Sequence, residues 1–117
     1  MDTVEIFAKL KSNPLQSGIT FSGGEPFAQP APLIGLAKLA HSAGYDVWSY
    51  TGYTYEELRD HEDKNVRELL NEVDVLVDGE YIEGERDLSL AFRGSRNQRV
   101  IDMNATRRTG RIVILPI

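Results

Sequence analysis

The chain has 117 residues, of which 41% are hydrophobic and 26% charged, and its formal net charge is −5. These values are ordinary for a globular protein with one core, so we expect a single domain over residues 1–117. The acidic balance argues against a nucleic-acid partner, which would favour a basic face. The sequence contains no cysteine, which excludes disulfides, thiolate chemistry and cysteine-held metal within this chain.

The ends of the chain and its apolar runs carry no sign of export or membrane insertion. Residues 1–5 are acidic rather than basic, unlike a signal peptide. No apolar run approaches the roughly 20 residues that span a bilayer. We therefore expect a cytoplasmic protein with no membrane partner.

The first half of the chain alternates helical and strand patterns. Residues 3–11 have a helical apolar stripe, and residues 18–22 form a β-branched and aromatic run typical of a strand. A second helix is expected where Pro32 suits a first turn and Gly44 a left-handed end. Its apolar face consists of Leu33, Leu36, Ala37 and Ala40.

The second half continues the alternation from a strand at residues 46–50. Thr54 and Glu57 form a capping-box pattern that begins a short helix. Another helical stripe follows, made of Val66, Leu69, Leu70 and Val73. Further strands are expected at 74–77, 99–103 and 111–115, with a polar segment at 78–87 and a short helix or an irregular stretch at 88–92.

The alternation of strands and helices predicts an α/β fold with right-handed crossovers between parallel strands. Each βαβ unit takes about 30 residues, so a closed eight-fold barrel is out of reach. We expect an open, curved, mostly parallel sheet of about five strands with flanking helices.

Residues 22–26, Ser-Gly-Gly-Glu-Pro, follow the first expected strand. Ligands of open α/β sheets bind at the carboxyl ends of strands, and glycine lets the backbone approach a ligand closely. The alternative is a tight turn that only joins strand to helix. The loop lacks the lysine of a phosphate-binding P-loop, which counts against a triphosphate ligand.

Two further strand ends point to the same edge of the sheet. Tyr50 and Thr51 end the second strand, and Asp78 ends the third. Their hydroxyl and carboxylate groups suit a ribose, a carboxylate or an ammonium group. Helix capping after Thr51 and turn formation by the Asp78–Gly79 pair are the structural alternatives.

Residues 92–99 are the densest polar cluster, and Asn97 and Gln98 supply donors and acceptors there. This cluster is either a site for a cofactor or partner protein or a solvated loop. The arginines that gather late in the chain form either a docking surface or an ordinary solvated surface, and the sequence favours neither interpretation. His41 and His61 have no partner spacing, so we interpret both as structural or exposed rather than as metal ligands.

Four segments occur in the order expected for one family: GITFSGGEPF at 18–27, DVWSYTGYTYEE at 46–57, DVLVDG at 74–79 and FRGSRNQRVID at 92–102. Together they resemble the radical S-adenosylmethionine (SAM) activating enzyme of anaerobic ribonucleoside-triphosphate reductase. The Gly-Gly-Glu loop marks the superfamily, and the second and fourth segments narrow the resemblance. The activase of another glycyl-radical enzyme, such as pyruvate formate-lyase, fits less well.

The resemblance implies a partial α/β barrel of the radical SAM type, of which this chain is a truncated core. It implies SAM and a [4Fe–4S] cluster as cofactors, with the cluster held by a CxxxCxxC loop that this chain lacks. It places Gly23, Gly24 and Glu25 at the methionine amino group of SAM, with Ser22 beside them. It places Tyr50, Thr51 and Asp78 at strand ends that face the nucleoside or methionine portion of SAM, and Asn97 and Gln98 in the SAM pocket or on the reductase surface. The isolated chain is therefore expected to be inactive and to have no catalytic or metal-binding residue of its own.

The resemblance also implies partners for the parent protein, namely the reductase and an electron donor such as flavodoxin. The first strand would lack a neighbour that the missing segment supplies, and an open strand edge favours pairing with a second copy. A different class of function stays open, since the chain is also interpretable as a non-catalytic nucleotide-binding or reductase-docking module.

Overall fold

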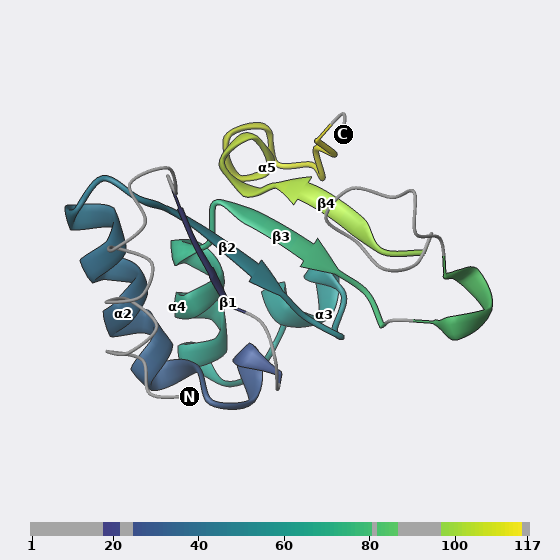
Figure 1. Ribbon diagram of the computed structural model, residues 1–117, viewed down its shortest axis with the longest axis horizontal. Coiled ribbons are helices and arrows are strands. Elements are labelled where there is room, and N and C mark those ends of the chain that lie inside the picture. The colour runs from purple at the N-terminus through teal and green to yellow at the C-terminus, as the bar shows by residue number, and fades with distance from the viewer. Residues whose placement is uncertain (1–17, 22–24, 81, 87–96, 116–117) are drawn as a thin grey trace.

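The computed structural model describes residues 18–21, 25–80, 82–86 and 97–115, which form an α/β fold around an open sheet (Figure 1). The strands are β1 (Gly18–Phe21), β2 (Asp46–Tyr50), β3 (Val75–Asp78) and β4 (Arg99–Asp102), in the order β1-β2-β3-β4. β1–β2 and β2–β3 are parallel, while β3–β4 is antiparallel. The expectation of an open, mostly parallel sheet with flanking helices is confirmed. The stretches expected at 3–11 and 88–92, and Ser22, lie outside the described residues.

Helices connect the parallel strands, and one of them begins at the capping box that the sequence indicated. η1 (Pro26–Ala28) and α2 (Pro30–Ser42) join β1 to β2, and α3 (Tyr55–Arg59) and α4 (Lys64–Glu72) join β2 to β3. The capping box of α3 is complete, because the Thr54 hydroxyl accepts from the Glu57 N–H at 3.2 Å and the Glu57 carboxylate accepts from the Thr54 N–H at 2.9 Å. Such a cap satisfies helix-end N–H groups that have no intrahelical partner.

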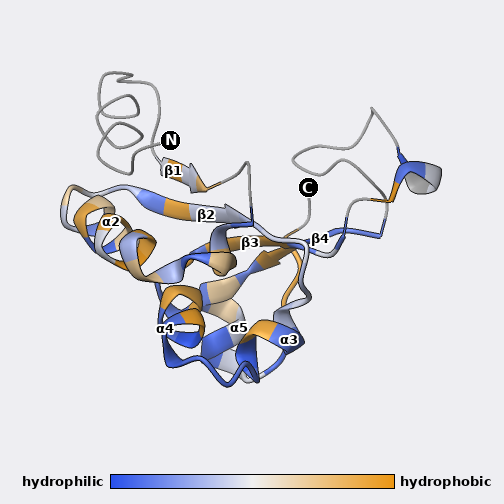
Figure 2. Cartoon of the chain, turned by 90° about the horizontal axis from the view of Figure 1, so that it is seen from below, coloured by the Kyte–Doolittle hydropathy of each residue, from blue (hydrophilic) through white to orange (hydrophobic). Residues whose placement is uncertain are grey.

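The main core lies between one face of the sheet and the helices. Alternate strand residues point to this face, as the two-residue period of a strand requires. In Figure 2 the four α-helices lie on the same side of the sheet. The core contains Ile19, Phe21, Val47, Leu76 and Ile101 from the sheet and Ile34, Leu36, Ala37, Ala40, Leu58, Val66, Leu69, Leu70 and Met103 from the helices. A smaller cluster on the other face contains Val75, Val77 and Val100, with Trp48, Tyr50 and Leu115 packed against it.

The end of the described chain differs from the expectation. A helix, α5 (Met103–Thr109), follows β4 directly, and residues 111–115 form only an isolated antiparallel bridge between Ile114 and Ile101 instead of a strand. Asp102 caps α5 by accepting from the Ala105 N–H at 3.0 Å, and Gly110 ends it in the left-handed region at φ 74°. The Asp102 cap therefore ends β4 one residue before the expected end at 103, and the expectation of about five strands was wrong for the described residues.

β1 lies at an edge of the sheet, and among the described residues it hydrogen-bonds only to β2. This leaves one row of its backbone groups without a strand partner in that part of the chain. None of the described helices is both long enough and apolar enough to cross a membrane.

Candidate functional site

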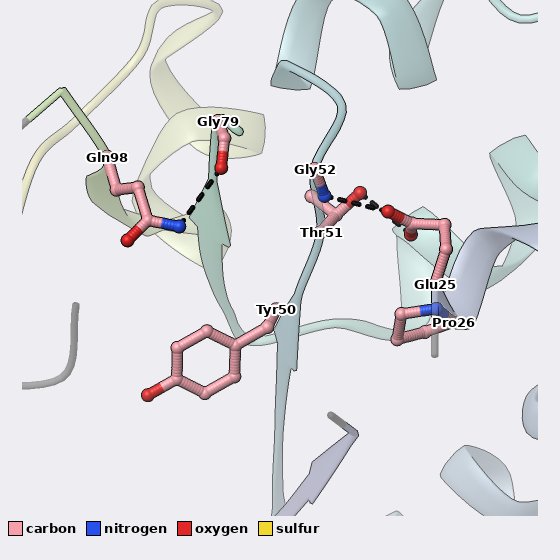
Figure 3. A pocket seen from close by; sticks show the side chains of 7 residues that line it. All are labelled: Glu25, Pro26, Tyr50, Thr51, Gly52, Gly79 and Gln98. Atoms are coloured by element: carbon pink, nitrogen blue, oxygen red, sulfur yellow. Dashed lines mark hydrogen bonds between the residues drawn. The ribbon is translucent and has the colours of Figure 1, made fainter. Parts of the chain in front are cut away.

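A pocket of about 240 Å³ opens at the edge of the sheet where β1, β2 and β3 end (Figure 3). It is lined by Glu25, Pro26, Tyr50, Thr51, Gly52, Gly79 and Gln98. Three parallel strands bring their carboxyl ends to this edge, and the antiparallel strand β4 begins there. The topology therefore gathers residues that are more than 70 positions apart in the chain.

Glu25 ties the segment after β1 to the segment after β2. One carboxylate oxygen accepts from the Thr51 hydroxyl at 2.9 Å and from the Phe27 N–H at 3.1 Å. The other accepts from the Gly52 N–H at 2.7 Å. All three partners donate, so the arrangement needs a group that only accepts, which an ionised carboxylate provides.

Thr51 is almost fully buried, with 4% of its surface exposed. Its hydroxyl also accepts from the Tyr53 N–H at 3.1 Å, so both of its roles are used within the chain. Tyr50 is half-buried and its ring lines the pocket, as Figure 3 shows. Burial raises the pKa of the Tyr50 hydroxyl, which keeps it protonated and able to donate at neutral pH.

Gly79 and Gln98 form the opposite wall of the pocket. Gly79 has φ 103°, a conformation that side chains rarely adopt, and its N–H donates to the Tyr53 carbonyl at 2.9 Å. Its carbonyl accepts from the Gln98 side-chain amide at 3.0 Å. Asn97 donates to the Glu80 carbonyl at 2.7 Å, so both amide side chains hold the chain that follows β3.

Asp78 lies beneath this wall, with 1% of its surface exposed, and is absent from the pocket lining among the described residues. Its carboxylate accepts from the Tyr55 N–H at 2.7 Å and from Arg99 through two nitrogens, Nε at 2.9 Å and Nη2. Nη2 of Arg99 also donates to Glu56 at 2.8 Å. The hydrogen bond to Asp78 is the main cause that raises the pKa of Arg99, and the hydrogen bond from Arg99 lowers the pKa of Glu56.

The structure brings together Glu25, Tyr50, Thr51 and Gln98 from the set of candidate residues named from the sequence. Ser22, Gly23 and Gly24 lie outside the described residues. Gly52 and Arg99 were not among the site residues chosen from the sequence, although Arg99 lies in the polar cluster at 92–99. The density of polar residues around Arg99 was a signal, but its pairing with Asp78 depends on the β3–β4 register.

A second polar cluster lies at the other end of the strands from the pocket, next to the amino end of β3. His41 contacts Glu72 at 3.2 Å and Asp74 at 2.8 Å, and Asp74 also accepts from the Val47 N–H at 2.7 Å. Burial by itself lowers the pKa of His41, but the hydrogen bonds and charges of Asp74 and Glu72 raise it above its usual value. Among the described residues no group of His, Cys, Asp or Glu suits a metal ion.

The described residues form an α/β fold with an open sheet, and the pocket lies at the carboxyl ends of its parallel strands, where sheets of this class bind ligands. Comparison with known families is more specific, because the 4Fe-4S single cluster domain family matches residues 2–101. The chain belongs to that family.

Named relatives share one description. The chain is 38% identical over 100 residues to the anaerobic ribonucleoside-triphosphate reductase-activating protein of Vibrio cholerae, which covers 80% of this chain and 61% of the relative. It is 39% identical over 90 residues to the protein of that name from Escherichia coli K12, covering 73% and 55%. The corresponding values for enterobacteria phage T4 are 32% over 105 residues, covering 86% and 62%. The chain thus spans little more than half the length of these relatives, and no solved structure matches it.

The cluster that gives the family its name does not fit the residues of this chain. Iron–sulfur clusters are held by cysteine thiolates, with histidine as the occasional substitute. The sequence has no cysteine, and the described residues contain no alternative metal-binding group. The chain therefore matches the family model over residues 2–101 but has no cysteine to hold the cluster.

Proposed function

We propose that this chain is part of an activase of anaerobic ribonucleoside-triphosphate reductase and supplies part of the SAM site. The observation that carries the proposal is the match of about four-fifths of the chain to a protein with that name. The pocket supports it, since it lies at the carboxyl edge where such sheets bind ligands. Residues 1–117 would then be a single domain, a truncated portion of a radical SAM barrel.

The pocket residues offer the groups that SAM needs. The Tyr50 hydroxyl and the Gln98 amide suit polar groups of SAM, while Glu25 and Thr51 set the shape of the wall. Ser22, Gly23, Gly24 and Asn97 are proposed from the resemblance. The volume of about 240 Å³ is below the roughly 300–1,000 Å³ usual for sites of drug-sized ligands, which fits a partial site.

The proposed reaction belongs to the whole parent protein. One electron from a donor such as flavodoxin cleaves SAM to methionine and a 5′-deoxyadenosyl radical, which takes a hydrogen atom from a glycine of the reductase and leaves a glycyl radical. Within this chain the pocket residues bind and orient SAM. A cytoplasmic location, and pairing of two copies through the β1 edge, are parts of the same proposal.

The chain by itself is proposed to hold no cluster and to be inactive. After reconstitution with iron and sulfide we expect no bound iron and no visible absorbance, because no thiolate is present. With SAM and dithionite we expect no 5′-deoxyadenosine. Stoichiometric iron in the purified chain would show that a cluster is held without cysteine, and formation of 5′-deoxyadenosine would show that the chain is active; either result contradicts the corresponding part of the proposal.

SAM binding is tested by NMR titration of the isotope-labelled chain. We expect weak binding with shifts confined to amides at the pocket, chiefly Gly52, Gly79 and Gln98. Gly52→Val should abolish these shifts, because Gly52 lines the pocket, its Cβ would already contact Glu25 Oε1 at 3.5 Å, and valine adds two methyl groups to that Cβ. Gly35→Val is the matched control, since a Cβ at this exposed position in α2 meets nothing within 4 Å. Shifts that are absent at saturating SAM, or that lie outside the pocket, would contradict the site.

The absence of cysteine favours one second candidate, a non-catalytic module that binds a nucleotide or docks on the reductase. Such a module would bind ATP or the reductase at least as tightly as SAM. Competition between ATP and SAM in the same titration, together with a pull-down of purified reductase, separates the two functions.

A further inference from the structure

A polar network lies beneath the pocket and connects three segments of the chain on the side opposite Glu25. Its members are Asp78 at the end of β3, Arg99 at the start of β4, and Tyr55 and Glu56 at the start of α3. We propose that Asp78 and Arg99 are positioning residues, which hold Gly79, Gln98 and the segment after β2 in the geometry that forms the pocket.

The ion pair is linked to the pocket wall directly by the polypeptide chain. Asp78 precedes Gly79, and Arg99 follows Gln98, so each partner of the ion pair is bonded directly to a pocket residue. Asp78 and Arg99 are also register partners on the antiparallel strands. A shift of the ion pair therefore moves both residues of this wall.

Side chains of β3 and β4 alternate between the helix side and the pocket side of the sheet. Leu76 and Ile101 face the helices. Asp78 lies two residues after Leu76 in β3 and Arg99 two residues before Ile101 in β4, so both lie on the same face. Gly79 and Gln98 are offset by one residue and line the pocket. The network thus holds the wall from the helix side and leaves the pocket side to the ligand.

The network also holds the segment between β2 and α3. Asp78 accepts from the Tyr55 N–H at 2.7 Å, and Gly79 donates to the Tyr53 carbonyl at 2.9 Å. These two bonds hold the residues that follow Gly52 against the end of β3. Through them a change at Asp78 reaches the part of the pocket that Glu25 contacts.

Burial makes the network sensitive to the loss of one partner. The Asp78 side chain is 1% exposed, and a buried carboxylate needs a partner for its charge. The Arg99 side chain is one-third exposed and donates through a planar fork to two carboxylates. A lysine has no such fork, so the substitution Arg99→Lys keeps the charge but loses the geometry.

The inference rests on the proposed SAM site, and the test separates the two. The variants are Arg99→Gln, Arg99→Lys and the neutral pair Asp78→Asn/Arg99→Gln, which leaves no unpaired buried charge and so favours a folded chain. Arg86→Gln is the matched control, because Arg86 is an exposed arginine whose ion pair, with Glu83, lies outside the network. SAM affinity, thermal midpoint and the amide resonances of Gly79 and Gln98 are measured for each folded variant.

We expect Arg99→Gln and the double variant to weaken SAM binding by about tenfold, Arg99→Lys to recover part of it, and Arg86→Gln to change nothing. The resonances of Gly79 and Gln98 should move in the same order. Unchanged affinity and unchanged resonances in the double variant would overturn the inference and leave the network a purely stabilising role. If the wild-type chain binds no SAM, the proposed function fails, and unmoved Gly79 and Gln98 resonances still decide against the positioning role.

Discussion

Glu25→Gln is the substitution that most sharply tests how the pocket is held together. The Glu25 carboxylate accepts from three donors, which are the Thr51 hydroxyl and the N–H groups of Phe27 and Gly52. A glutamine side chain has the same shape but one oxygen and one NH₂ group. Whichever way the amide is turned, its NH₂ group faces one of the two backbone N–H groups, and a donor opposes a donor.

The cost follows from the number of bonds that are lost. A hydrogen bond to a charged group contributes about 1.5–3 kcal/mol, and Glu25 is only half-buried, so we expect Glu25→Gln to lower the free energy of unfolding by about 1.5–3 kcal/mol. For a chain of this size the thermal midpoint should fall by roughly 5–15 °C.

Urea unfolding followed by circular dichroism, with a thermal scan beside it, measures this effect. Glu62→Gln is the matched control, because Glu62 is exposed and makes no hydrogen bond among the described residues, and its effect should stay within about 0.5 kcal/mol. If Glu25→Gln also stays within that range, the cross-link between the segments after β1 and β2 does not stabilise the fold, and the reasoning is refuted.

Further substitutions test the remaining parts of the structure. Gly79→Ala should cost about 1–3 kcal/mol in urea unfolding, because φ 103° is strained for a residue with a Cβ; a neutral result would contradict that conformation. His41→Gln should lose about 0.5–1 kcal/mol near pH 5.5 and almost nothing near pH 9. The reason is that the pKa of His41 is raised in the folded chain, so its stabilisation is complete below the unfolded pKa of about 6.5 and disappears as the pH rises through the folded pKa; equal losses at both pH values would refute the charge pairing. Leu69→Ala should cost about 2–5 kcal/mol, since Leu69 is fully buried between α4 and the sheet, and a loss below about 1 kcal/mol would place it outside the core.

Local patterns in the sequence were sufficient for the elements that combine a periodic apolar face with a cap. The strand at 46–50 has the expected bounds, and the capping box of Thr54 and Glu57 begins α3 as predicted. The apolar stripe of Val66, Leu69 and Leu70 is the buried face of α4. In each case the information lies within a few neighbouring residues, because side-chain periodicity and helix capping are local effects.

Two features at the end of the chain were missed because competing local signals had similar strength. Residues 99–103 and 111–115 both have a β-branched apolar pattern, but only the first pairs with β3 over several residues. The Asp102 cap and Gly110 are helix-end signals that the strand interpretation ignored. The antiparallel direction of β4 also had no local signature, because strand direction depends on the path of the chain between β3 and β4 and not on the residues of β4.

The sequence by itself determined the α/β class, the end of the parallel strands where the candidate polar residues gather and, through its lack of cysteine, that this chain has no thiolate to hold a cluster. Only the tertiary structure decided what the polar residues at that edge do. From the sequence, Asp78 was expected to bind a ligand at the end of its strand. In the structure it is buried and paired with Arg99, 21 residues further along the chain. A sequence specifies which groups are available, whereas a hydrogen bond depends on distance in space, and only the register of β3 with β4 brings these two charges together.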